Sequence, residues 1–260
     1  MARACHPGPT LAVTVLTALL CGALGHGLAT GLVVTAAVFT GQLTIGWSND
    51  LIDAARDRAV GRTDKPLATG DLSEGLVRRA IGVAGVACLG LSAACGWRAA
   101  VVHVLLVVGS GWAYNLGLKR TAWSAVPYAV AFGSLPAVVS LAAADRAWPP
   151  LWMLVTGAVL GVGAHLLNAL PDLSDDDATG VRGLPHRLGP RLVRLLAPLV
   201  LLVGSVVATL GPGGDVPVAA WVGLAVCGAL AAVALVGRGK GPFLAAVGIA
   251  LVDVCVLVLR

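Results

Sequence analysis

The sequence predicts an all-α, polytopic membrane protein with about nine transmembrane helices. Hydrophobic residues make up 58% of its 260 residues and charged residues only 12%, whereas soluble domains carry roughly 25% charged residues. The mean hydropathy of +0.90 points the same way. The 34 glycines suit the close helix–helix contacts of membrane bundles. We therefore treat residues 1–260 as a single domain embedded in a lipid bilayer.

The predicted spans are apolar runs of roughly 17–25 residues, the length of helix that crosses the hydrocarbon core. They cover residues 10–26, 28–53, 76–96, 99–118, 123–144, 151–171, 191–210, 217–236 and 241–259. Two longer polar stretches, 54–75 and 172–190, interrupt the series. The first apolar run leads directly into others, so we interpret it as a membrane helix and not as a cleaved signal peptide.

The basic residues of the loops predict the orientation. Those that follow the second, fourth, sixth and eighth spans are Arg56, Arg58, Arg62, Lys65, Lys119, Arg120, Arg182, Arg187, Arg238 and Lys240. The opposite loops hold little beyond Arg98 and Arg146. The positive-inside rule therefore places the even-numbered loops and the N-terminus in the cytoplasm. The net charge of +5 has the same explanation, so we expect no nucleic-acid partner.

Two clusters of acids and amides stand at the ends of the second and sixth spans, where charge is costly and indicates function. In chain order their members are Asn49, Asp50, Asp53, Asp57, Asn168, Asp172 and Asp176. Spacings of three and four residues place each cluster on one helix face. Like charges this close repel one another, and hard divalent cations with oxygen ligands, Mg²⁺ in particular, relieve the repulsion.

Cations bracket both acidic clusters. They are Arg56, Arg58, Arg62, Lys65, Lys119, Arg120, Arg182 and Arg187. Arginine and lysine beside metal-binding acids indicate an anionic ligand such as phosphate or diphosphate. A polar, metal-binding head site at the edge of an apolar interior fits an isoprenoid diphosphate, because a water-poor cavity protects an allylic cation.

The motifs resemble, in the same order, those of the UbiA superfamily of intramembrane prenyltransferases. The matching segments are the NDxxDxxxD motif at 49–57, the loop 62–70, the Tyr-to-Lys-Arg stretch 114–120, the DxxxD motif with its upstream amide at 168–176, and the loop 180–189 that ends in Arg-Leu-Gly. With the spans in this order, the resemblance covers nearly the whole chain. Either acidic motif alone would be a weak signal, and the combination is a strong one.

The resemblance implies a helical bundle around a central cavity and transfer of a prenyl group to an aromatic or quinonoid acceptor. It implies that the catalytic and Mg²⁺-binding residues are Asp50, Asp53, Asp57, Asp172 and Asp176. It also implies a diphosphate site with contacts from Asn49, Lys65, Lys119, Arg120 and Asn168. The positive-inside rule places this site on the cytoplasmic side.

The acceptor side is where the sequence offers least. Near the first span it provides Arg3, His6 and Thr10, and one turn before Asn168 it provides His165, which either faces the cavity or packs on an apolar face. An acceptor-free terpene cyclase of the same architecture therefore stays open. An ion- or proton-coupled transporter would explain the acids but not the bracketing cations. An alcohol phosphotransferase uses a single longer acidic run that does not match residues 50–57.

Overall fold

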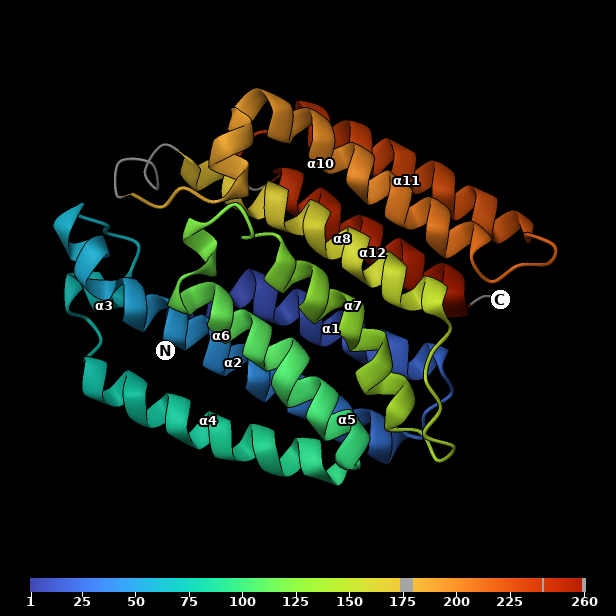
Figure 1. Ribbon diagram of the computed structural model, residues 1–260, viewed down its shortest axis with the longest axis horizontal. Helices are drawn as coiled ribbons and strands as arrows, with labels where there is room; N and C mark the ends of the chain where they lie inside the picture. The colour runs from blue at the N-terminus through green and yellow to red at the C-terminus, as the bar shows by residue number, and fades with distance from the viewer. Residues whose placement is uncertain (174–179, 240, 259–260) are drawn as a thin grey trace.

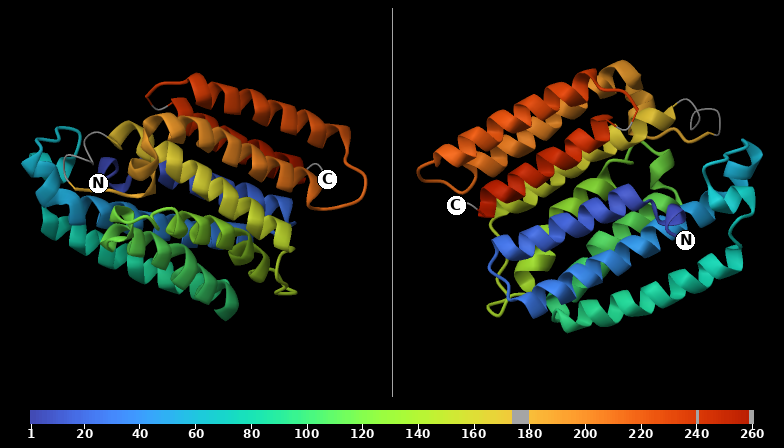
Figure 2. Two further views of the ribbon diagram at one scale, coloured as in Figure 1. Left: turned by 45° about the horizontal axis from the view of Figure 1, so that its top comes forward. Right: turned by 180° about the vertical axis from the view of Figure 1, so that it is seen from behind.

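The computed structural model describes residues 1–173, 180–239 and 241–258, and every regular element within these ranges is helical. The long helices lie roughly parallel or antiparallel to one another in one bundle (Figure 1). Two further views show the same side-by-side arrangement (Figure 2). The prediction of an all-α membrane fold is confirmed.

The helices follow the predicted order of spans. They are α1 Pro7–Ala23, α2 Leu28–Ala59, α3 Pro66–Thr69, α4 Glu74–Ala94, α5 Trp97–Val101, α6 Gly109–Leu116, α7 Val126–Leu141, α8 Leu151–Ala169, α10 Leu184–Leu210, α11 Val218–Val236 and α12 Gly241–Val258. Short helical segments are η1 Arg3–Cys5, the π-helix η2 Val102–Val108, η3 Leu118–Arg120 and η4 Leu170–Asp172. Because η2 joins α5 to α6, residues 97–116 form one continuous span.

Six helices in the described part of the chain are long and apolar enough to cross a membrane. Three shorter apolar helices, Pro7–Ala23, Val126–Leu141 and Gly241–Leu257, accompany them. These helices lie at the short end of the range that spans a bilayer. Each predicted span therefore has an apolar helix, while the count of nine crossings stays a prediction.

Two helices extend beyond the limits of the predicted spans. We expected the second span to end at residue 53, but α2 continues to Ala59. Acids at helical spacing do not interrupt a helix, and Arg56 and Arg58 in its last turn complement the helix dipole. We expected the seventh span to begin at residue 191, but α10 begins at Leu184 and bends at Gly189, whose φ of 78° leaves the helical region.

Local sequence signals explain the connection between α2 and α4. Pro66 occupies the first turn of α3, where its missing N–H costs nothing, and Gly70 ends α3 with a φ of 84°. Ser73 then caps α4, because its side chain accepts a hydrogen bond from the Leu76 backbone N–H. This connection carries Lys65 back toward α2.

Small residues let α7 and α8 approach closely. A Cβ added at Gly161 would lie 2.6 Å from the carbonyl oxygen of Tyr128, and one at Gly133 would lie 3.0 Å from the Cβ of Ala158. Glycine is needed at such positions because any side chain would push the helices apart. The close contact fixes how Tyr128 and the end of α8 face the interior.

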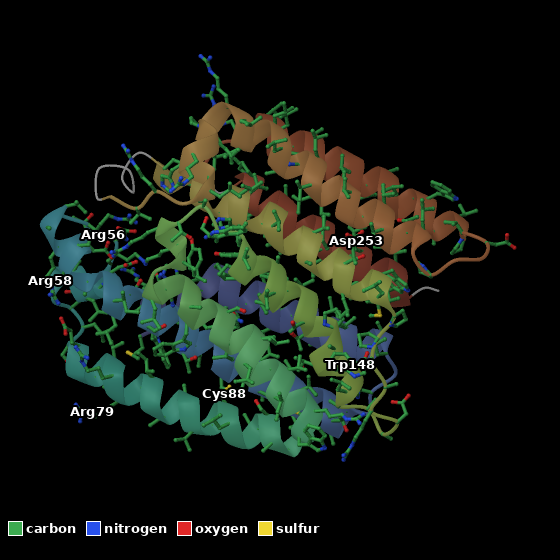
Figure 3. The ribbon with its side chains drawn as sticks, in the orientation of Figure 1. Arg56, Arg58, Arg79, Cys88, Trp148 and Asp253 are labelled. Atoms are coloured by element: carbon green, nitrogen blue, oxygen red, sulfur yellow. The ribbon has the colours of Figure 1, made fainter. Side chains whose placement is uncertain are left out.

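The polar connections gather at one end of the bundle. The connections after α2 and η3, and η4 itself, lie at the same end as the N-terminus, and the last turn of α12 lies at the opposite end (Figures 1 and 2). Arg56 and Arg58 lie at the first end, whereas Trp148 lies at the other (Figure 3). The first acidic motif and the described part of the second, far apart in sequence, therefore approach the same end of the fold.

Candidate active site

Three buried carboxylates line one face of α2. The exposed fractions of Asp50, Asp53 and Asp57 are 1%, 4% and 4%. A buried carboxylate is stable only where cations or hydrogen-bond donors compensate its charge. The neighbours of these three side chains therefore define the chemistry of the site.

Asp50 is held by a lysine and a histidine from outside α2. Lys65 Nζ donates to Asp50 Oδ1 at 2.6 Å, and His6 Nε2 lies 2.9 Å from the same oxygen. Lys65 Nζ and His6 Nε2 are themselves 3.1 Å apart. The other oxygen, Oδ2, is buried and has no hydrogen-bond partner among the described residues. One oxygen of this carboxylate therefore has its hydrogen-bonding capacity unused.

Asp53 is held by a second lysine that is almost fully buried. Lys119 Nζ, on η3, donates to both carboxylate oxygens at 2.7 and 2.6 Å. Arg56 Nη2 lies 3.1 Å from Asp53 Oδ2 and 3.7 Å from Asp57 Oδ1. Burial lowers the pKa of Lys119 below its ordinary range, and the adjoining Asp53 carboxylate opposes that shift. The two side chains therefore depend on each other for charge compensation.

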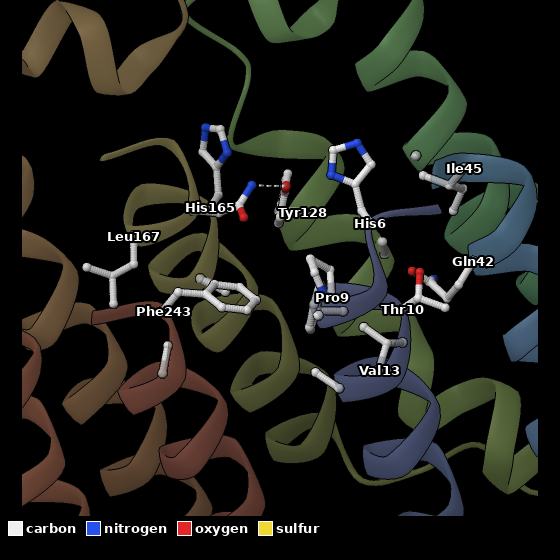
Figure 4. Close-up of a pocket in the computed structure, with 18 of the residues that line it drawn as sticks. His6, Pro9, Thr10, Val13, Gln42, Ile45, Tyr128, His165, Leu167 and Phe243 are labelled. Carbon is white, nitrogen blue, oxygen red and sulfur yellow. Dashed lines mark hydrogen bonds between the residues drawn. The ribbon is translucent and has the colours of Figure 1, made fainter. Parts of the chain in front are cut away.

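The two amides of the motifs are also anchored. Asn49 Nδ2 donates to Asn115 Oδ1 at 3.0 Å, which links α2 to α6. Asn168 Nδ2 donates to the hydroxyl oxygen of Tyr128 at 3.3 Å, which links α8 to α7 (Figure 4). Both amides are thereby fixed with side-chain atoms that line the same cavity.

The second acidic motif is described only in part. Asn168 lies in the last turn of α8, and the backbone of Asp172 lies in η4 directly after it. Asp176 lies outside the described residues. Arg120, at the end of η3, is exposed beside Lys119. The structure thus brings Asn49, the three acids of α2, Lys65, Lys119 and Asn168 to one end of the bundle.

A cavity of about 720 Å³ opens beneath these groups. The polar residues that line it include Asp53, Lys119 and Asn168, which define its polar end. His6 belongs to the same lining and is labelled in Figure 4. Away from that end its walls are apolar and come from α1, α7, α8 and α12, with Leu16, Leu20, Leu135, Phe132, Leu160 and Val247 among them. The cavity is therefore amphipathic, with charge at one end and hydrocarbon along its length.

His165 packs within a small aromatic group at the cavity wall. Its ring centroid lies 4.7 Å from that of Tyr128 and 5.7 Å from that of Tyr114. Its Nε2 lies 3.0 Å from Ser124 Oγ, which also accepts a hydrogen bond from the Leu184 backbone N–H. Both sequence alternatives for this residue hold in part, because His165 lines the cavity and is 1% exposed.

The residues present fit a hard divalent cation. Carboxylate and amide oxygens are the ligands that Mg²⁺ prefers, and the orphaned Asp50 Oδ2 offers such an oxygen in a buried position. Among the described residues, however, no three His, Cys, Asp or Glu side chains converge as a ready-made metal site. Lysine side chains contact two of these carboxylates instead, Lys65 that of Asp50 and Lys119 that of Asp53.

Two partners in this site were not assigned a role from the sequence. We named His6 only as a possible acceptor contact, but it lies against Asp50, 44 residues away. Asn115 lies inside the stretch 114–120 that resembles the family, but we assigned it no role of its own. A buried amide one residue after Tyr114, on a span that must face α2, is the signal that could have identified it.

Two sequence comparisons match this chain to known proteins. The profile described as "UbiA prenyltransferase family" matches residues 10–242. The chain is 30% identical, over 210 residues, to the bacteriochlorophyll synthase 33 kDa chain of Cereibacter sphaeroides. That alignment covers 73% of this chain and 67% of the relative.

Solved structures share the fold. A UbiA homologue from Aeropyrum pernix K1, solved in its apo form, superposes with a TM-score of 0.78 at 19% identity and covers 95% of this chain and 97% of its own. A UbiA homologue from Archaeoglobus fulgidus bound to DMAPP and Mg²⁺ superposes with a TM-score of 0.74 at 14% identity, covering 100% and 99%. The same protein bound to GPP and Mg²⁺ gives 0.69 at 14% identity, covering 98% of each chain.

Proposed function

This chain belongs to the UbiA prenyltransferase family, and we propose that it cleaves an isoprenoid diphosphate and transfers the prenyl group to a hydrophobic aromatic or quinonoid acceptor. The observation that carries the proposal is the amphipathic cavity, whose charged end includes the buried Lys119–Asp53 pair and Lys65. A diphosphate needs cations and an isoprenoid chain needs hydrocarbon, and this cavity offers both.

In the proposed site, Lys65, Lys119 and Arg120 bind the diphosphate oxygens, and Asn49 and Asn168 orient them. Lysine ammonium groups form strong, charge-assisted hydrogen bonds to phosphate oxygens. Their positions beside the carboxylates of α2 support this assignment, because the same end of the cavity then holds donors and acids together. The donors would stabilise the charge that develops on the departing diphosphate.

The proposed metal ligands are Asp50, Asp53 and Asp57 on α2 together with Asp172 and Asp176 of the second motif. When Mg²⁺ is bound there, it supplies Lewis-acid stabilisation of the diphosphate leaving group. The Archaeoglobus fulgidus homologue was solved with Mg²⁺ and either GPP or DMAPP, which supports the choice of metal and of substrate class.

The apolar walls of the cavity have two roles in this proposal. They bind the isoprenoid chain, and they exclude the water that would quench an allylic cation. Tyr128 and Phe132 stack with their ring planes 6° apart and their centroids at 6.2 Å, so aromatic faces lie close to the charged end. Such faces attract cations through the quadrupole of the ring.

The reaction is proposed to take place at the cytoplasmic surface of the membrane. The distribution of basic residues supports that orientation, since Arg56, Lys65 and Lys119 all line the cavity. Arg56 and Arg58 lie at the same end of the bundle (Figure 3). The diphosphate would then enter from the cytoplasm while the prenyl chain stays among the helices.

A terpene cyclase is the second candidate, and a specific observation favours it. The polar groups near α1 are already engaged, because His6 contacts Asp50 and the Thr10 hydroxyl donates to the Cys5 carbonyl oxygen at 2.7 Å. An acceptor would therefore find few free polar partners in this region. A cyclase would use the same ionisation and would end the reaction within the prenyl chain.

Product analysis separates the two candidates. The purified chain would be incubated with geranyl, farnesyl and geranylgeranyl diphosphates and Mg²⁺, each with and without quinonoid and aromatic acceptors. Transfer predicts diphosphate release and a prenylated product that both depend on the acceptor. Hydrocarbon or terpene-alcohol products formed without any acceptor would support the cyclase and contradict transfer.

A further inference from the structure

Two lysine–aspartate pairs occupy the carboxylates of the first motif. Lys65 Nζ is 2.6 Å from Asp50 Oδ1, and Lys119 Nζ is 2.7 and 2.6 Å from the two oxygens of Asp53. The two lysines come from different elements. Lys65 lies in the connection after α2, and Lys119 lies in η3, so the tertiary fold brings them together. Both ammonium groups lie where a divalent cation would also bind.

The described cluster is already close to charge balance. Its three acids and three cations are Asp50, Asp53, Asp57, Arg56, Lys65 and Lys119. An acidic motif without lysine partners attracts free metal strongly, because like charges repel until a cation arrives. Here the lysines already offset most of the repulsion between the carboxylates. The binding of a free divalent ion is therefore less favourable than at an acidic motif without lysine partners.

Lys119 cannot leave Asp53 without a new partner. Its exposed fraction is 5%, so a displaced ammonium stays inside the protein, and its charged neighbours Arg56 and Arg120 repel it. A buried charge that loses its partner is strongly destabilised. Release of Asp53 to a metal ion alone is therefore unfavourable.

A diphosphate changes this balance. Its oxygens accept hydrogen bonds from ammonium groups, so each lysine can move from a carboxylate to a phosphate oxygen without losing charge compensation. The carboxylate oxygens are then available to a metal ion at the same time. Metal and diphosphate therefore favour each other's binding, which is positive cooperativity with a favourable, negative coupling free energy between the two ligands.

We propose that Lys65 and Lys119 act as exchangeable counterions that make the site selective for metal and diphosphate together and resistant to free metal. The inference rests on the proposed function for the identity of the diphosphate, but the resistance to free metal follows from the lysine–aspartate contacts alone. Each lysine would begin bound to its aspartate and end bound to the diphosphate.

The test measures binding of Mn²⁺ alone to the purified full-length chain, from the electron paramagnetic resonance signal of free Mn²⁺. The variant Lys119→Met keeps most of the side-chain volume and removes the ammonium. It is expected to bind Mn²⁺ more tightly than the wild type, by about 5- to 150-fold, the usual range of coupling between sites. Lys65→Met, at a more exposed position, is expected to change in the same direction.

Two control variants separate exchange from general effects of charge and folding. Arg120→Met removes a neighbouring positive charge that belongs to neither lysine–aspartate pair, and it should tighten Mn²⁺ binding much less. Lys119→Arg keeps the charge and should retain weak binding. If neither Lys119→Met nor Lys65→Met binds Mn²⁺ more tightly than wild type, the proposal is overturned.

A second measurement tests the coupling itself. A non-cleavable geranyl thiodiphosphate should bind the wild type far more tightly with Mg²⁺ than without it, and Lys119→Met should reduce that ratio. An unchanged ratio in the variant would contradict the coupling. If the wild type turns over prenyl diphosphates while the Mn²⁺ result is negative, this inference fails and the proposed function stands. If the Mn²⁺ result is positive and no prenyl diphosphate reacts, the resistance to free metal stands and the proposed function fails.

Discussion

The side-chain amide of Asn49 donates a hydrogen bond to Asn115 Oδ1 at 3.0 Å, which ties the first residue of the acidic motif on α2 to the last turn of α6. Asn115 Nδ2 in turn donates to the Ser48 hydroxyl oxygen and the Ile45 carbonyl oxygen, both at 2.9 Å. The Asn115 side chain is 3% exposed and uses its donor and acceptor atoms together. It therefore sets the orientation of the motif.

Replacement of Asn115 should impair catalysis through Asn49. Asn115→Leu is close in volume but removes all three hydrogen bonds. We expect kcat/KM for the prenyl diphosphate to fall by about 10- to 100-fold, as for residues that orient metal ligands. Asn115→Asp keeps the acceptor for Asn49 and should lose less. Equal losses in both variants, at matched thermal stability, would contradict an orienting role.

The Asp53–Lys119 pair should show strong thermodynamic coupling. Asp53→Asn leaves the Lys119 ammonium buried without an anion, and Lys119→Met leaves the carboxylate without its lysine, so each single change should lower the free energy of unfolding by about 3–5 kcal/mol. The double variant should be less destabilised than the sum of the two changes. Thermal denaturation in the same detergent measures all four proteins, and additive losses would show that the pair is not coupled.

Replacement of Gly46 by alanine should impair activity. A Cβ at this position would overlap the backbone carbonyl of Cys5 and displace η1, and with it His6 from Asp50. Gly46→Ala should therefore lower kcat/KM. Gly228→Ala, in α11, is the matched control because nothing lies within 4 Å of its added methyl group. If Gly228→Ala lost as much activity as Gly46→Ala, the result would contradict a specific effect of the contact between Gly46 and Cys5.

A buried carboxyl group away from the acidic motifs should contribute to stability. Asp253, on α12, accepts a hydrogen bond from Ser205 Oγ of α10 at 2.9 Å, and Cys227 Sγ of α11 lies 3.6 Å from its other oxygen. Asp253→Ala would remove the carboxylate acceptor of the fully buried Ser205 hydroxyl and should cost about 1–3 kcal/mol. Asp253→Asn keeps an acceptor and should cost less, which thermal unfolding of the two variants would show.

The sequence was sufficient for the fold class and for the face of α2 that carries the acids. Hydropathy identified the helices, and the spacing of Asp50, Asp53 and Asp57 placed them together. It was not sufficient for the end of α2, because we ended the span where apolar residues ended although the helix itself continued. Span prediction by hydropathy measures compatibility with lipid, and helices extend beyond the bilayer.

The partners of the acids required the tertiary structure. Lys119 is 66 residues from Asp53 and belongs to η3, which follows Gly117. His6 reaches Asp50 from a backbone conformation with a φ of 53°, which is uncommon for residues other than glycine. Neither contact follows from periodicity, because both depend on how segments outside the spans fold back over the cavity.

Release of diphosphate from a prenyl diphosphate tests the central claim most directly. The purified chain would be assayed with geranylgeranyl diphosphate and acceptors in Mg²⁺ and, in parallel, in excess chelator, beside the Asp53→Asn variant. We predict release by the wild type in Mg²⁺, and loss of release both in chelator and in the variant. Release that persists at the wild-type rate in chelator or in folded Asp53→Asn would contradict a metal-assisted diphosphate site at the polar end of this cavity.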